Sequence, residues 1–209
     1  MNIILMGCPG AGKGTQSAKL KDFFGLKHIS TGDVLRAEIA SGSALGNQVK
    51  DIIAQGNLVP DSLMISILEN IIKTADKGVI LDGFPRTTAQ AEALKTMLQG
   101  LGRAVDKVVM IDLPESEVVK RLSSRRLCKA CGKIAQSAAD TVCGACGGEL
   151  YVRADDTPES VKHRLEVYRR DTLPVINYYR QSGKFVQING NQPVANVFED
   201  IKKSLEEVK

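Results

Sequence analysis

The chain opens with Met1 to Thr15, MNIILMGCPGAGKGT, and this stretch decides the fold. Residues 2–6 are mostly apolar, and the next seven, Gly7 to Lys13, fit the pattern G-x-x-x-x-G-K. A buried strand that turns into a helix is expected. Glycines let the loop backbone wrap around a phosphate, while loop N–H groups, the helix N-terminus and the Lys13 ammonium supply positive charge. The stretch therefore predicts a nucleoside triphosphate site; the alternative is a glycine-rich turn that binds nothing.

The predicted phosphate-binding residues of this loop are Gly10, Ala11, Gly12, Lys13, Gly14 and Thr15. Most such loops carry Ser or Thr directly after the lysine, where its hydroxyl binds Mg²⁺. Here the position after the lysine is Gly14, and the hydroxyl comes one residue later, at Thr15. This departure narrows the family to which the chain can belong.

Size and charge indicate an enzyme-sized chain that handles small ligands. The chain has 209 residues, of which 43% are hydrophobic and 25% charged, enough for one core with small insertions. Its net charge of +4 is too small and too dispersed to indicate nucleic acid, so small anionic ligands are expected. No apolar run approaches the roughly 20 residues that a membrane span needs. We expect a cytoplasmic protein with no membrane or nucleic-acid partner.

Strand and helix patterns alternate along the chain, which predicts an α/β fold with a parallel five-stranded sheet covered by helices on both faces. The expected strands are residues 2–6, 26–29, 79–82, 107–111 and 185–188. The expected helices are residues 13–24, 30–40, 44–55, 60–75, 88–99 with Thr88 as its cap, 115–124, a long helix from 157 that breaks at Pro174, and 193–208.

Ligands of such sheets bind beyond the carboxyl ends of the strands. That places the loop 7–13, Asp82 and Asp112 along one edge. A carboxylate at a strand end suggests a functional site, although Asp112 could equally be a residue of the turn that follows its strand.

Four cysteines give the second strong motif. Cys128-x-x-Cys131 and Cys143-x-x-Cys146 can present four thiolates tetrahedrally to one metal, and zinc is the expected ion. Four protein ligands leave no open position, so the zinc should be structural. The alternative is a pair of disulfides, which a cytosolic chain disfavours.

The remaining cysteine and the two histidines carry weaker expectations. Cys8 lies in the phosphate loop, where a helix N-terminus could make it reactive, but a small residue that fits beneath the loop is the preferred interpretation. We expect His28 and His163 to be hydrogen-bonded or solvated rather than catalytic.

Four motifs together resemble the adenylate kinase family. They are Gly7–Thr15, Ser30–Arg36, Leu81–Arg86 and Arg153–Asp156, and their order and spacing match along nearly the whole chain. The resemblance implies a P-loop NTPase-type core made of residues 1–29, 60–123 and 157–209. It also implies a helical insertion that binds a nucleoside monophosphate (NMP) at 30–59 and a lid at 124–156, in the variant with zinc on four cysteines. Zinc-lid relatives carry an aromatic residue soon after the first cysteine pair, whereas this chain reads Gly132-Lys133-Ile134-Ala135.

The resemblance implies the reaction ATP + AMP = 2 ADP in a monomer, with Mg²⁺ bound mainly by the phosphates. Alignment and charge stabilisation dominate phosphoryl transfer, and arginine forks bind phosphate bidentately. The implied catalytic residues are Lys13, Asp82 for the Mg²⁺ water shell, Arg86, Arg125, Arg153 and Arg164. Further ATP contacts are expected from Arg121, stacked on adenine, Arg125 and Gln192. The implied AMP-binding residues are Thr31, Arg36, Asn57, Leu58, Val59, Gly83, Phe84, Pro85, Arg86, Gln90, Arg153 and Arg164.

Other kinases of this fold are the nearest alternatives. Thr31 and Gln90 favour AMP over UMP or CMP, because a glutamine amide can donate to and accept from the adenine edge. Nothing in the sequence excludes a GTP-using AMP kinase. A regulatory GTPase would need an N-K-x-D motif after a later strand, and this motif is absent. A zinc-ribbon nucleic-acid binder would need a basic surface around its cysteine pairs, yet residues 135–141 contain no basic residue.

Overall fold

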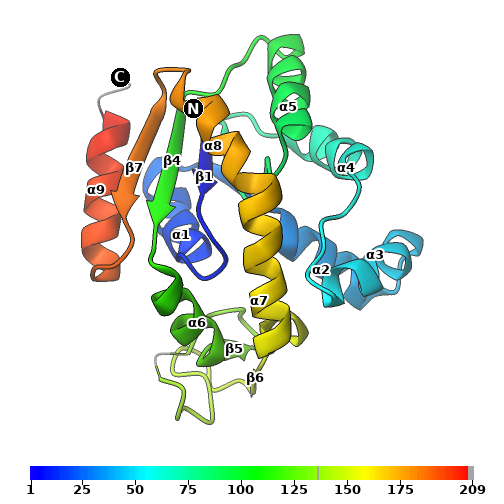
Figure 1. The fold of residues 1–209 in the computed structure, drawn as a ribbon, viewed down its shortest axis with the longest axis vertical. Coiled ribbons are helices and arrows are strands. Elements are labelled where there is room, and N and C mark those ends of the chain that lie inside the picture. The colour runs from blue at the N-terminus through cyan, green and yellow to red at the C-terminus, as the bar shows by residue number, and fades with distance from the viewer. Residues whose placement is uncertain (136, 207–209) are drawn as a thin grey trace.

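A computed structural model describes residues 1–135 and 137–206. Its centre is a five-stranded, all-parallel sheet with the strand order β2-β3-β1-β4-β7 (Figure 1). The strands are β1 (Asn2–Met6), β2 (Lys27–Ser30), β3 (Val79–Asp82), β4 (Lys107–Asp112) and β7 (Phe185–Asn189). The first strand expected from the sequence therefore occupies the middle of the sheet, as its fully buried side chains require.

Helices cover both faces of this sheet. They are α1 (Lys13–Phe24), α2 (Thr31–Ser41), α3 (Ala44–Ala54), α4 (Asp61–Lys73), α5 (Thr88–Gly100), α6 (Glu115–Ser123), α7 (Pro158–Val167), α8 (Leu173–Arg180) and α9 (Val194–Glu206). Because successive strand residues point to opposite faces, Ile3 and Leu5 pack with α1, α6, α7 and α9. Ile4 and Met6 pack on the other face with α4, α5 and α8. The predicted α/β architecture with two covered faces is confirmed.

Two smaller parts extend from the carboxyl end of the sheet, toward which β4 and β7 point in Figure 1. The first is the α2–α3 pair, which follows β2; Ser30 caps α2 by accepting a hydrogen bond from the Asp33 N–H at 3.3 Å. The second contains the antiparallel pair β5 (Leu127–Cys128) and β6 (Leu150–Tyr151), followed by the short 3₁₀ turn η1 (Ala154–Asp156). Both parts therefore lie at the edge where the phosphate loop opens.

Several local predictions need correction. The cap of α5 is Thr87, whose hydroxyl accepts from the Gln90 N–H at 3.1 Å, and not Thr88. The chain does not break at Pro174: a π-helical turn, η2 (Tyr168–Thr172), joins α7 to α8, and the proline sits in the first turn of α8, where its missing N–H costs little. The β5–β6 pair was not predicted. The last helix ends at Glu206 in the described part of the chain; the predicted residues 207 and 208 lie outside the described residues.

Within the described ranges, no helix combines the length and the apolar character needed to cross a membrane.

Candidate functional site

The phosphate loop connects β1 to α1 through backbone conformations that only glycine adopts easily. Gly7 has φ +147°, and a β-carbon there would lie 2.6 Å from the Ile111 carbonyl oxygen of the neighbouring strand. Gly12, with φ +96°, is the N-cap of α1. The backbone thus turns sharply enough to place the first residue of the helix, Lys13, against its own loop.

The Lys13 ammonium is held inside this loop. Its Nζ donates to the carbonyl oxygens of Gly7 at 2.8 Å and Cys8 at 3.0 Å. Burial lowers the pKa of Lys13, whereas the nearby Asp82 carboxylate acts to raise it. The loop therefore presents a pre-positioned, poorly solvated positive charge, which suits an anionic ligand.

Asp82 ends β3 directly beside the start of α1. A β-carbon at Gly14 would lie 3.6 Å from Asp82 Oδ2, an ordinary contact distance, so the carboxylate lies directly beside the residue after Lys13. His28 Nε2 lies 3.5 Å from the same oxygen. A buried carboxylate next to a phosphate loop fits a group that holds the water shell of Mg²⁺.

The first of two pockets lies between the α2–α3 insertion, the β3–α5 loop, the η1 turn and Arg164 of α7. It is open to solvent, and its empty volume, the open part included, is about 600 Å³. The predicted AMP-binding residues that line it are Thr31, Arg36, Asn57, Leu58, Val59, Gly83, Phe84, Arg86, Gln90, Arg153 and Arg164. Pro85 lines the second pocket instead. The structure thus brings residues from distant parts of the sequence together around one pocket.

The structure also shows pocket residues that the sequence did not predict. They are Gly32, Leu35, Ile53, Gly56, Met64 and Asp155. Helical spacing marks Leu35, Ile53 and Met64 only as residues of an apolar face, which is the signature of any core position. No sequence signal distinguished their roles.

Gln90 is more constrained than its predicted base-reading role requires. Its Oε1 accepts from the Arg86 N–H at 2.8 Å, and its Nε2 donates to Asp61 Oδ1 at 2.7 Å. Asp61 Oδ2 in turn accepts from the Thr87 hydroxyl at 2.8 Å. The amide retains one more lone pair and one more N–H, so these bonds leave it able to contact a base while fixing its orientation.

The second pocket, of about 560 Å³, connects the phosphate loop to the first. Lys13, Gly7 and Pro9 line one side of it. It shares five lining residues with the first pocket: Gly56, Leu58, Gly83, Arg86 and Arg164. The two pockets therefore adjoin across two arginines, and Lys13 faces the space between them.

Two aspartates of η1 organise the arginines. The Asp156 side chain is fully enclosed and accepts from Arg125 Nε and Nη2, at 2.7 and 2.5 Å, and from Arg164 Nη1 at 3.0 Å. Asp155 accepts from two of the three Arg153 nitrogens, Nε and Nη2, at 2.8 and 2.5 Å, and lies 3.3 Å from Arg164 Nη1. Both aspartates belong to the motif Arg153–Asp156, but the motif alone does not predict this role.

The protonation of these groups follows from burial and proximity. Burial lowers the pKa of Arg164 to about 10, while Asp155 and Asp156 act to raise it, so the guanidinium stays charged at neutral pH. Burial also lowers the pKa of Arg86 and Arg125. Burial raises the pKa of Asp155, but Arg164 and Arg153 outweigh it and hold that pKa below its usual value. The cluster therefore keeps its positive charges fixed in place.

Of the predicted ATP-binding residues, Lys13 lines the second pocket, whereas Arg121, Arg125, Gln192 and the loop residues Gly10, Ala11, Gly12, Gly14 and Thr15 line neither pocket. Arg125 belongs to the arginine–aspartate cluster just described. Arg121 Nη2 donates to the Gly190 carbonyl oxygen at 3.1 Å, and Gln192 Nε2 donates to Asp200 Oδ2 at 2.7 Å. Arg121 and Gln192 thus lie near the loop after β7. The stacking of Arg121 on adenine and the contact of Gln192 with ATP stay predictions.

Two expectations about single residues are resolved. The Cys8 thiol is buried, and burial raises its pKa, which favours the small residue beneath the loop over the reactive thiol. Asp112 is the exposed last residue of β4 and lines neither pocket; its Oδ2 accepts from Gln187 Nε2 at 2.9 Å and its carbonyl oxygen from the Gly190 N–H at 2.6 Å.

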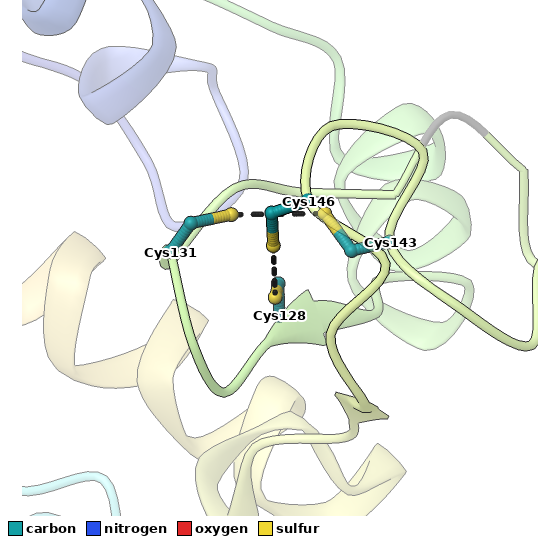
Figure 2. Close-up of side chains that lie close together, drawn as sticks. All are labelled: Cys128, Cys131, Cys143 and Cys146. Carbon is teal, nitrogen blue, oxygen red and sulfur yellow. Dashed lines mark hydrogen bonds between the residues drawn. The ribbon is translucent and has the colours of Figure 1, made fainter.

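Figure 2 shows the sulfurs of Cys128, Cys131, Cys143 and Cys146 converging on one point, and all lie within 4.8 Å of one another. The Cys128–Cys146 and Cys131–Cys143 sulfurs are 3.5 and 3.6 Å apart, too far for disulfides. Tetrahedral zinc with bonds of about 2.3 Å needs sulfurs about 3.8 Å apart, so the four residues fit the ion.

Hydrogen bonds shift the pKa values of these thiols. The Cys131 N–H chiefly lowers the pKa of Cys128 to about 6. The Gly148 N–H lowers the pKa of Cys146, but the thiols of Cys131 and Cys128 outweigh it and raise that pKa to about 12. A metal cation would remove the repulsion among these thiolates.

The comparisons with known proteins agree with this geometry. The family model described as Adenylate kinase matches residues 5–184. The chain is similar to proteins named adenylate kinase from Kosmotoga olearia (49% identity, 99% of each chain), Methanosarcina mazei (47%, 98% of each) and Archaeoglobus fulgidus (44%, 100% of each). The chain therefore belongs to the adenylate kinase family, the phosphotransferases that interconvert ATP and AMP with two molecules of ADP.

Proposed function

We propose that AMP binds in the first pocket and that the triphosphate of ATP binds the loop at Lys13, with the phosphoryl group passing across the second pocket. One observation carries this proposal: the pocket that Lys13 lines shares Arg86 and Arg164 with the pocket lined by the predicted AMP residues. Two anionic phosphates must approach each other during transfer. Positive groups on both sides of that path offset their repulsion.

In this proposal the arginines divide the phosphates among them. Arg36 and Arg86 hold the AMP phosphate, Arg125 holds the ATP phosphates, and Arg153 and Arg164 contact both. The aspartates of η1 support this division, because Asp155 and Asp156 fix three of these guanidiniums by short hydrogen bonds. Preorganised charges need not reorient during the reaction, which is the main source of rate enhancement in phosphoryl transfer.

We also propose that the chain is divided into a core, an NMP-binding insertion and a lid. Residues 30–59 and 124–156 form the insertion and the lid, and they close over the core of residues 1–29, 60–123 and 157–209, because transfer in an open cleft would lose phosphoryl groups to water. Mg²⁺ travels with the ATP phosphates, and Asp82 holds its water shell. When bound, the Mg²⁺ ion would neutralise part of the negative charge of the phosphates.

We propose that the four cysteines of the lid bind a structural zinc ion. This ion takes no part in phosphoryl transfer. A free four-thiol site needs reducing surroundings, and this supports the proposal that the protein acts in the cytoplasm. A monomer is also proposed, in keeping with the family resemblance of the sequence.

Chromatography of the nucleotides after incubation tests the function. ATP and AMP together should yield two ADP, with AMP preferred over UMP, CMP and GMP as acceptor and ATP over GTP as donor. Equal turnover with UMP or CMP would indicate a pyrimidine-directed kinase, and preference for GTP would indicate a GTP-dependent AMP kinase. Absence of phosphoryl transfer to any acceptor would refute the proposal.

A further inference from the structure

His163 lies on α7 next to Arg164, yet it does not line either pocket. Its Nε2 is 2.8 Å from Asn57 Oδ1, on a segment 106 residues earlier in the chain. The Asn57 amide nitrogen donates to Gln55 Oε1 at 3.3 Å, which leaves Oδ1 as the acceptor and makes His163 Nε2 the donor. The imidazole therefore joins the end of the insertion to the helix that carries Arg164.

This contact adds to a close approach of the two backbones. A β-carbon at Gly56 would lie 2.8 Å from Arg164 Cγ and 3.4 Å from Ser160 Oγ, so residue 56 rests directly on α7. Gly56 has φ +79° and lacks side-chain contacts of its own that could hold it there. The Gly56 and Asn57 N–H groups donate to the Ile53 and Ile52 carbonyl oxygens of α3, both at 3.0 Å, which ties the segment to the insertion. The hydrogen bond from His163 to Asn57 ties the same segment to α7.

The tied segment is a wall of the first pocket. Four consecutive residues, Gly56 to Val59, line that pocket, and Gly56 and Leu58 also line the second. A displacement of this segment would widen both pockets beside Arg164. Its position therefore affects a bound AMP directly, although His163 itself lies outside the pockets.

We propose that His163 is a positioning residue for the AMP pocket, and that its hydrogen bond to Asn57 holds residues 56–59 against α7. The proposal rests on the function proposed above and deepens it, since it assigns part of AMP affinity to a residue that does not touch the nucleotide. If residues 56–59 are already held in their binding position, AMP binding does not have to order them, and the entropic cost of binding is smaller.

The other groups near the imidazole do not replace this bond. Glu166 Oε2 lies 3.8 Å from His163 Nδ1, one turn further along α7. It faces the ring nitrogen that does not contact Asn57. Loss of its charge should leave the tie to the insertion intact.

The test measures AMP and ATP affinity by titration calorimetry in matched variants. His163→Leu removes the donor at similar size and should weaken AMP binding about 2- to 10-fold, the range expected for one hydrogen bond, with ATP affinity unchanged. His163→Gln offers an amide N–H to Asn57 Oδ1 and should restore most of the AMP affinity. Lys162→Ala, an exposed neighbour on the same helix, serves as the control.

A double-mutant cycle decides whether the effect passes through Asn57. In an Asn57→Ala background, His163→Leu should have little further effect on AMP affinity. Amide hydrogen exchange of residues 56–59 should be faster in His163→Leu and normal in His163→Gln. This readout does not depend on activity.

The outcomes separate the two claims. Failure of the wild-type protein to bind AMP would refute the proposed function and the positioning role with it. Normal AMP binding by wild type, with His163→Leu indistinguishable from Lys162→Ala, would refute the positioning role alone. An equal loss of AMP affinity in both Asn57 backgrounds would also overturn it.

Discussion

Removal of the Asp156 carboxylate should destabilise the protein more than any other single change at an ion pair of the site. Asp156→Ala deletes the acceptor of three hydrogen bonds, two from Arg125 and one from Arg164. The aspartate side chain is fully enclosed, and the arginine side chains are only 13% and 17% exposed. Two guanidiniums would therefore lose a partner where water reaches them poorly.

The magnitude follows from this geometry. Three charge-assisted bonds at about 1.5–3 kcal/mol each would exceed 4 kcal/mol, but they are not additive. Arg164 also keeps its bond to the Asp155 carbonyl oxygen at 2.7 Å. A loss of about 3–5 kcal/mol, as for other broken buried pairs, is the better expectation. For a chain of this length, it corresponds to a fall in melting temperature of roughly 6–20 °C.

Thermal unfolding followed by circular dichroism without nucleotide measures the effect. Glu115→Ala is a matched control, because Glu115 makes a similar two-point contact with Arg169 on the exposed surface, where water screens the charges. Its melting temperature should stay near that of wild type. Melting of Asp156→Ala within about 2 °C of wild type would refute the idea that this carboxylate holds the arginines in place.

Three further outcomes are expected. Lys13→Ala should lower turnover about 100-fold or more without unfolding the protein. Lys21→Ala, on the same helix, is the control and should leave turnover unchanged. If Lys13→Ala retained more than about a tenth of wild-type turnover, the proposed catalytic role of the phosphate loop would be wrong. Gln90→Ala should reduce the preference for AMP over CMP by about 1–3 kcal/mol, measured as the ratio of their kcat/KM values. The substitution should also lower the melting temperature, because Gln90 bonds Arg86 and Asp61. An unchanged preference for AMP over CMP would contradict the proposal that Gln90 reads the base. Cys143→Ser, or a chelator under mild denaturation, should lower the melting temperature clearly, while part of the activity at low temperature survives. A structural zinc site would be ruled out if metal analysis found no zinc in the protein. It would also be ruled out by complete loss of activity with an unchanged melting temperature.

The sequence was most informative where a function is encoded in neighbouring residues. The strand–loop–helix at the N-terminus and the two cysteine pairs each place their chemistry within a few positions, so local geometry was enough to predict them. The strands alternate with helices, and this alternation predicted the parallel sheet.

Tertiary pairing was not predictable in the same way. Which arginine binds Asp155 or Asp156, and that His163 meets Asn57, depend on how distant segments pack. A single sequence carries no record of such partners.

Smaller errors have local causes. Thr87 and Thr88 both offer a capping hydroxyl, so their order along the chain could not decide between them. Pro174 suggested a break, but the wider π turn before it absorbs the change in hydrogen bonding, and the helix continues.

The most direct test of the whole account is a crystal structure with a bisubstrate analogue, two adenosines joined by a phosphate chain. We predict one adenosine in the pocket beside Gln90, and a phosphate chain that passes between Arg86 and Arg164 to reach Lys13. A phosphate chain bound away from Lys13, or both adenosines outside the pocket of Gln90, would contradict the proposed path of phosphoryl transfer.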